Sequence, residues 1–154
     1  MRISQAQAAE IARHSMKIAQ TLLKQRNEEL VELSVHSTDF EHRVAAAWYY
    51  GLAQEPSDCL FVLMRDRHPL VSLAARESCV AIAKRKFKEH DMDFGPRLNA
   101  PQSSKEACAD LWQAHFEKKA KEPRTEERNK PERPEKPKER TPAERTPAEI
   151  LGIE

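Results

Sequence analysis

Apolar residues recur every three or four positions up to about Phe116, the spacing of one buried face of an α-helix. The longest such stripe runs from Ser4 to Gln25 without an interrupting Gly or Pro. Further helices are predicted at 28–36, from about Phe40 to Leu52, and at 57–64, 70–88 and 103–119. No segment alternates with the period of two that strands show. The sequence therefore predicts an all-α domain of about six helices joined by short loops.

Residues that begin or cap helices stand near these boundaries. Ser37-Thr38-Asp39 offers caps for the helix that starts near Phe40. Pro56 suits the first turn of the next helix, because its missing N–H is not needed there, and Pro69 stands at the following start. Ser103 and Glu106 have the spacing of a capping box, which predicts the start of the last helix.

The last part of the chain has a different composition. Six of the ten prolines fall between Pro123 and Pro147, and residues 121–149 mix both charges without a large apolar side chain. Such a segment buries too little surface to offset the entropy of ordering, so we expect it to be disordered. The sequence thus predicts a helical domain at 1–119, a disordered Pro- and charge-rich linker at 120–149 and an apolar peptide at 150–154.

The apolar peptide carries three large aliphatic residues after a polar tether: Ile150, Leu151 and Ile153. One hypothesis is that it docks on a partner, since a tether raises the effective concentration of a weak second contact. The alternative is that it folds back on its own domain.

Charge and cysteine content limit the function classes. The 26 basic residues nearly balance 25 acidic ones, and the net charge of +1 argues against a general polyanion binder. Cys59, Cys79 and Cys108 form no Cys-x-x-Cys pair and suit core thiols in a reducing compartment. We see neither a secretory h-region nor the roughly 18 apolar residues of a membrane span. A cytoplasmic protein without membrane contact is expected.

Two segments match at an offset of 27 residues, those beginning at Asp39 and at Asp66. In each, Val follows five residues after the Asp and Ala three residues later, and a short apolar helix precedes the Asp. This pattern resembles the HEAT repeat over about residues 28–88. The resemblance implies a helix A, a turn in which Asp caps helix B, and small residues that let neighbouring helices approach. Arg often follows the Val in that family, whereas Ala45 and Ser72 stand there.

The sequence gives no support for catalysis. It has no Gly-rich phosphate loop, no Gly-x-Ser-x-Gly, no His-Glu-x-x-His and no His pair at i and i+4. We therefore expect no catalytic residue, no metal site and no cofactor. HEAT-like folds also occur in DNA glycosylases and in lyases that attach bilin chromophores, so an enzyme is the third hypothesis.

A binding surface is the leading hypothesis, with protein as the partner. In HEAT-like stacks helix B commonly lines the concave face, which would align Arg43, Tyr50 and Arg76 there with Tyr49 on the flank. Tyr50 is expected to be exposed and Trp48 to belong to the core. The alternative is that Tyr50 only covers the edge of the core.

Nucleic acid is the second candidate partner. Its phosphates would meet a basic cluster at the end of a predicted helix, formed by Lys84, Arg85, Lys86 and Lys88. The helix dipole alone also favours cations at that position. The sequence thus predicts a non-catalytic adaptor, and as its alternative a nucleic-acid-binding helical repeat.

Overall fold

A computed structural model describes residues 2–122 of the chain. The chain separates into a unit of residues 1–119 and a second unit of residues 120–154, of which only 120–122 are described. The described residues form helices and loops without a strand, which confirms the all-α class.

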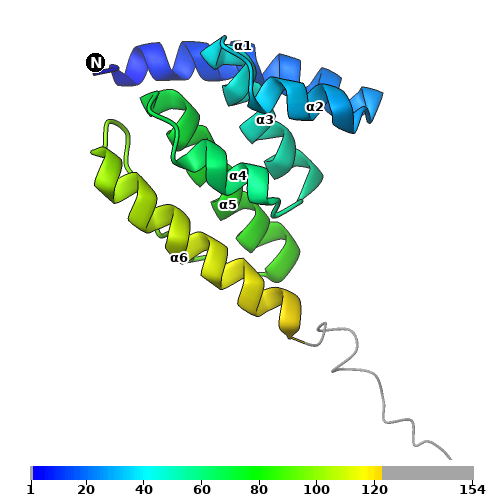
Figure 1. Ribbon diagram of the computed structural model, residues 1–154, viewed down its shortest axis with the longest axis vertical. Coiled ribbons are helices and arrows are strands. Elements are labelled where there is room, and N and C mark those ends of the chain that lie inside the picture. The colour runs from blue at the N-terminus through cyan, green and yellow to red at the C-terminus, as the bar shows by residue number, and fades with distance from the viewer. Residues whose placement is uncertain (1, 123–154) are drawn as a thin grey trace, which may run out of the picture. The chain divides into compact units, whose positions relative to one another are not determined.

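Six helices follow one another in the described residues (Figure 1). Their bounds are α1 Gln5–Gln25, α2 Glu28–Val35, α3 Phe40–Ala53, α4 Asp58–Met64, α5 Pro69–Phe87 and α6 Gln102–Lys121. Each lies within one or two residues of the range predicted from the apolar spacing.

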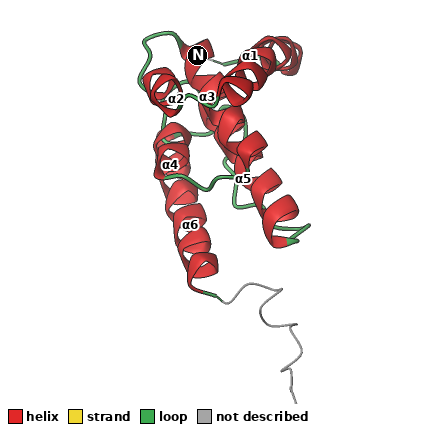
Figure 2. Ribbon diagram, turned by 90° about the vertical axis from the view of Figure 1, so that its right-hand side faces the viewer, coloured by secondary structure: helices red, strands yellow, loops and turns green. Residues whose placement is uncertain are grey.

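The helices pair into two hairpins, α2–α3 and α4–α5, that stack through α3 and α5 (Figure 2). Helix α1 packs on α3 at one end of the stack. Helix α6 covers the other end through Phe116, whose ring centroid lies 6.1 Å from that of Phe61 in α4 and 5.9 Å from that of Phe87 in α5. Helix α3 therefore has neighbours on several sides and is the central element of the core.

Small residues bring α3 and α5 together. Ala45, Ala46 and Ala47 are fully buried. A Cβ added at Gly51 would lie 2.9 Å from the Cβ of Ser78, so a larger residue does not fit without a shift. The Ser78 hydroxyl donates to the Ala47 carbonyl at 2.6 Å, which satisfies a buried polar group at this close approach.

The helix starts confirm some of the predicted caps and correct others. Asp39 accepts from the Glu41 N–H at 3.0 Å and caps α3, as expected. Pro69 occupies the first turn of α5. Pro56, however, precedes the N-cap Ser57 and lies outside α4, so its predicted place in the first turn is wrong.

The capping box predicted at Ser103 and Glu106 is also wrong. Helix α6 already begins at Gln102, and the Lys105 N–H donates to the Pro101 carbonyl at 3.1 Å. The Gln102 side chain donates to the carbonyl of Arg65 at 2.6 Å, which fixes this end against the α4–α5 turn. A capping box exists instead at Ser4, whose hydroxyl and N–H both bond Gln7.

Asp66 connects the two hairpins rather than capping α5. Its carboxylate accepts from Arg43 Nε at 2.7 Å and Nη2 at 3.2 Å. It also accepts from the N–H of His68 at 2.8 Å. Arg43 donates in addition to the Ser37 carbonyl at 2.8 Å, so a single guanidinium joins the turns of both hairpins. The prediction that Asp66 caps helix B is therefore wrong.

The cap of α5 is His68. Its Nδ1 accepts from the Leu70 N–H at 3.2 Å, and the ring stacks on Phe40 with centroids 3.9 Å apart. An imidazole can accept at Nδ1 only while that nitrogen is unprotonated. The cap therefore depends on the neutral ring.

We expect the His68 cap to make the stability of the domain sensitive to mild acid. Burial lowers the pKa of His68 from its usual 6.5, an effect that Asp66 opposes and that Arg43 and Lys105 strengthen. Because the folded-state pKa is the lower one, stability is full above pH 6.5 and falls as pH drops towards the folded-state pKa. His68→Asn keeps a capping oxygen that does not titrate.

Urea unfolding at pH 7.5 and 5.0 tests this expectation. The wild type should lose about 1 kcal/mol more than His68→Asn between these values, the typical contribution of an N-cap. His90→Asn is the control, because His90 lies on the exposed surface and caps no helix. Equal losses in the wild type and His68→Asn would contradict this role of the cap.

Candidate functional site

The two tyrosines of α3 are buried. Tyr49 and Tyr50 are each 7% exposed, and their neighbour Ala46 is fully buried. The prediction that Tyr50 faces solvent is wrong. It assumed that α3 buries only the face that carries its apolar stripe, whereas other helices also cover the side on which Tyr50 lies. Trp48 is half-buried and packs at the edge of the core.

Arg43 and Arg76 are both held by carboxylates of the domain. Arg43 pairs with Asp66 as described, and Arg76 Nε donates to Asp93 at 3.0 Å. The hydrogen bond from Arg76 holds the pKa of Asp93 below its usual value. Of the residues predicted to form a protein-binding surface, Arg43 and Arg76 thus each pair with a carboxylate of the same domain, and the rings of Tyr49 and Tyr50 are buried.

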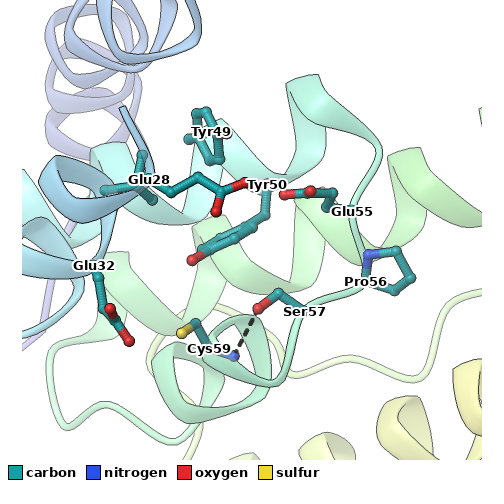
Figure 3. A pocket seen from close by; sticks show the side chains of 9 residues that line it. Glu28, Glu32, Tyr49, Tyr50, Glu55, Pro56, Ser57 and Cys59 are labelled. Atoms are coloured by element: carbon teal, nitrogen blue, oxygen red, sulfur yellow. Dashed lines mark hydrogen bonds between the residues drawn. The ribbon is translucent and has the colours of Figure 1, made fainter. Parts of the chain in front are cut away.

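Tyr49 and Tyr50 instead line a pocket of about 380 Å³ between α2 and the start of α4 (Figure 3). The pocket, which we name the tyrosine pocket, is formed by α2, the end of α3 and the turn that leads into α4. Its residues are Glu28, Val31, Glu32, Tyr49, Tyr50, Glu55, Pro56, Ser57 and Cys59.

Local backbone geometry shapes one wall of the tyrosine pocket. Helix α3 ends where Gln54 takes a left-handed conformation, with φ of 56°, and the chain turns back. Ser57 then caps α4 by accepting from the Cys59 N–H at 3.2 Å. In Figure 3 this segment carries Glu55, Ser57 and Cys59 around the Tyr50 ring, while Glu28 and Glu32 reach the pocket from α2.

All charged residues that line the tyrosine pocket are acidic. Glu28, Glu32 and Glu55 take part in no ion pair within the described residues, and no Lys or Arg lines the pocket. Burial raises the pKa of Tyr49, and the charges of Glu55 and Glu28 raise it further. The tyrosine hydroxyls are therefore neutral, and the negative charge of the pocket comes from the carboxylates.

An apolar groove of about 510 Å³ lies on the other side of α2, between α2 and α1. Leu30 and Leu33 line it from α2, and Leu33 is 69% exposed. The remaining lining residues of this α1–α2 groove are Ile18, Thr21, Leu22, Gln25, Ser34, Ser37 and His42. We call the tyrosine pocket and the α1–α2 groove together the α2 surface, because α2 forms a wall of both.

The predicted phosphate cluster shares no residue with the α2 surface, although Lys86 reaches the turn that carries Glu55. Lys84, Arg85, Lys86 and Lys88 are all exposed at the end of α5. Lys86 Nζ lies 3.4 Å from the Gln54 carbonyl, which it can reach as a donor. Phosphate binding there stays a prediction. Ile150, Leu151 and Ile153 lie outside the described residues.

The described residues also bear on metal and membrane binding. Between residues 2 and 122, no three His, Cys, Asp or Glu side chains are grouped so that they could hold a metal ion. No helix in that range is both long and apolar enough to cross a membrane. The three carboxylates of the tyrosine pocket therefore form no such group.

Sequence reasoning overlooked the tyrosine pocket. Its one local signal is the pair Glu28 and Glu32, which are four residues apart and share a face of α2 with Val31. Glu55 gives no such signal, because only the turn after α3 brings it to the pocket. Comparison with protein-family models, curated proteins and solved structures gives no match to this chain.

Proposed function

We propose that the chain is a non-catalytic adaptor that binds a segment of another protein on its α2 surface. The observation that carries this proposal is the exposure of Leu33 and Leu30 over an apolar groove next to three unpaired carboxylates. Exposed apolar patches with a polar border are typical of interaction sites. The groove would take apolar side chains, and the pocket would take a positively charged one.

The proposed architecture is a short HEAT-like stack of two units. Support comes from the two successive helix hairpins and from the sequence match between the segments that begin at Asp39 and Asp66, which are 27 residues apart. The helices α2 and α4 begin 30 residues apart and α3 and α5 begin 29 apart, so the spacing of the two units differs slightly from that of the sequence match. Such stacks commonly present their helix faces as binding surfaces for partners. The three cysteines, all free thiols, fit the reducing environment of the cytoplasm.

Nucleic-acid binding remains a separate hypothesis. It would use Lys84, Arg85, Lys86 and Lys88, and its affinity would fall steeply with salt concentration. The carboxylates of the α2 surface would repel phosphates, so the α2 surface favours a protein partner.

We expect Leu33→Asp to weaken partner capture at least tenfold, the effect of losing a central apolar contact. Quantitative mass spectrometry of proteins captured from the cells of origin measures this. Leu111→Asp is the matched control, because Leu111 is also an exposed helical leucine, 51% exposed, that lies outside the α2 surface. Full capture by Leu33→Asp, with loss on Lys86→Glu, would contradict the proposal and favour nucleic acid.

A further inference from the structure

The α1–α2 groove presents apolar side chains between two helices at the same end of the stack (Figure 1). Ile18 and Leu22 line it from α1. Leu30 and Leu33 line it from α2, and Leu33 is 69% exposed. Among the described residues that line the groove, none is Asp, Glu, Lys or Arg. An occupant would therefore place apolar side chains in the groove, since removing them and the leucines from water is favourable.

The charged residues on the α2 side of the groove are acidic. Leu33 lines the groove and also a neighbouring hollow of about 410 Å³, whose other lining residues are Glu29, Glu32 and His36. Glu29 and Glu32 are exposed and take part in no ion pair within residues 2–122. Helix α2 contains neither Lys nor Arg. A partner that covers Leu33 therefore meets carboxylates beside it.

The charged residues on the α1 side of the groove are basic. Thr21 and Gln25 line the groove, and Lys17 and Lys24 stand four residues before and three residues after Thr21. Residues at these spacings share a face of a helix, so both lysines border the groove. Both are exposed and neither takes part in an ion pair within the described range. The two rims thus have opposite charge and form no ion pair with each other.

Opposite charges on the two rims favour a helical occupant over an extended one. An extended segment points successive side chains to opposite faces, so the neighbours of an inward apolar residue point away from the groove. An α-helix has an apolar stripe with side chains on both flanks, which can reach both rims.

The length of the groove fits two turns of such a helix. Its lining residues Ile18 and Gln25 are seven residues apart, about 10 Å along α1. Positions i and i+7 of a docked helix have the same separation. The groove therefore has room for apolar side chains at i, i+4 and i+7, the spacing with which amphipathic helices bind in grooves.

We propose that the α1–α2 groove binds an amphipathic helix of a partner protein, with basic residues along one flank of its apolar stripe and acidic residues along the other. The stripe packs on Leu33 and Ile18, the basic flank lies against the carboxylates of α2, and the acidic flank lies against the lysines of α1. Since the rims differ in charge, the flanks also fix the direction of the helix in the groove. This inference rests on the proposed function, because it names the kind of segment that the α2 surface takes.

Synthetic helical peptides added to the full ¹⁵N-labelled chain test the inference by NMR. The peptides have leucines at i, i+4 and i+7 and differ only in their flanks: lysine on one side and glutamate on the other, lysine on both, or glutamate on both. We expect the mixed peptide to shift the amides of residues 18–25 and 30–34. It should bind about fivefold more tightly than the other two, the combined effect of a few exposed ion pairs. Tighter binding of the peptide with lysine on both flanks would overturn the inference.

The direction of the docked peptide gives a second readout. A nitroxide at the amino terminus of the mixed peptide broadens the amide signals near it. Exchanging the lysine and glutamate flanks should move this broadening between the two ends of the groove, near residue 18 and near residue 25. Broadening at the same end for both peptides would mean that the rims do not orient the helix, and the inference would be wrong.

Matched variants assign the effect to the α1 rim. Lys17→Gln combined with Lys24→Gln should remove the advantage of the mixed peptide over the peptide with lysine on both flanks. Lys84→Gln combined with Lys88→Gln is the control, because both of these lysines are exposed and neither lines the groove. An equal loss of the advantage in the control pair would contradict the role of the α1 lysines.

Two other occupants of the groove would be visible without any peptide. If the amide positions of residues 18–25 change with protein concentration, a second copy of the chain fills the groove. If Ile150→Asp combined with Ile153→Asp shifts the same amides, the apolar peptide of the chain itself fills it. Either result would overturn the inference.

The two proposals can fail separately. If no peptide shifts the groove amides while Leu33→Asp still abolishes partner capture, the helix inference is wrong and the adaptor proposal stands. If Leu33→Asp captures the partner fully, the adaptor proposal is wrong whatever the peptides do.

Discussion

Trp112→Ala is expected to lower the free energy of unfolding by about 4 kcal/mol, within the range for removing a large buried aromatic. Trp112 is fully buried in α6 and stacks on Phe116 at a centroid distance of 5.5 Å. It also meets Phe94 edge to face at 4.9 Å, and its indole N–H donates to the Gly95 carbonyl at 2.8 Å. The substitution leaves a cavity and an unpaired carbonyl together.

Urea unfolding followed by circular dichroism measures this loss. Leu111→Ala is the control from the adjacent position, and its exposed side chain predicts a change within about 0.5 kcal/mol. A loss below about 1 kcal/mol for Trp112→Ala would mean that α6 is not held by this aromatic cluster. Since native domains are stable by only about 5–15 kcal/mol, the expected loss is a large share of the total.

The second large effect is expected at the ion pair that joins the hairpins. Arg43 and Asp66 should show a coupling energy of about 2 kcal/mol in a double-mutant cycle with alanine, as expected for hydrogen bonds between charged groups. Their side chains are only 20% and 16% exposed, so water screens the pair weakly. The cycle is needed because Asp66 also binds the His68 N–H, and that contribution cancels in the coupling term.

The pair Arg65–Asp110 gives the matched control. Its side chains are 32% and 74% exposed. Exposed ion pairs typically contribute at most about 0.5 to 1 kcal/mol to stability. Equal coupling in the two cycles would show that the link between the hairpins is an ordinary surface pair. A clearly larger coupling energy for Arg43 and Asp66 would support the view that one guanidinium links the two stacked hairpins.

The helices were predictable because their signals are local. The stripe from Ser4 to Gln25 and the observed α1, Gln5–Gln25, differ by one residue at one end, where Ser4 is the cap. Asp39 caps α3 because a short polar side chain before a helix can reach the free N–H groups of its first turn. These features depend on neighbours in sequence.

Burial in α3 was harder to predict because the apolar stripe assumes one covered face. Tyr50 falls outside the stripe of Val44 and Ala47, yet it is buried, since α3 packs against several helices. The consecutive buried alanines from Ala45 to Ala47 were the available signal, because small residues on all sides of a helix indicate close neighbours.

The failed cap at Ser103 and the overlooked pocket have a common cause. Pro101 provides the carbonyl that the Lys105 N–H uses, so α6 begins one residue before Ser103. Glu55 reaches the tyrosine pocket only because Gln54 reverses the chain after α3. Both depend on tertiary contacts or on a backbone turn that the residue pattern does not specify.

Hydrogen–deuterium exchange of the full chain, with and without the captured partner, tests the central claim most directly. If the α2 surface is the binding site, the partner should slow exchange at residues 28–35 and 55–60 and leave 84–88 unchanged. Protection confined to residues 84–88, with residues 28–35 unaffected, would contradict the account and place the binding site at the basic end of α5.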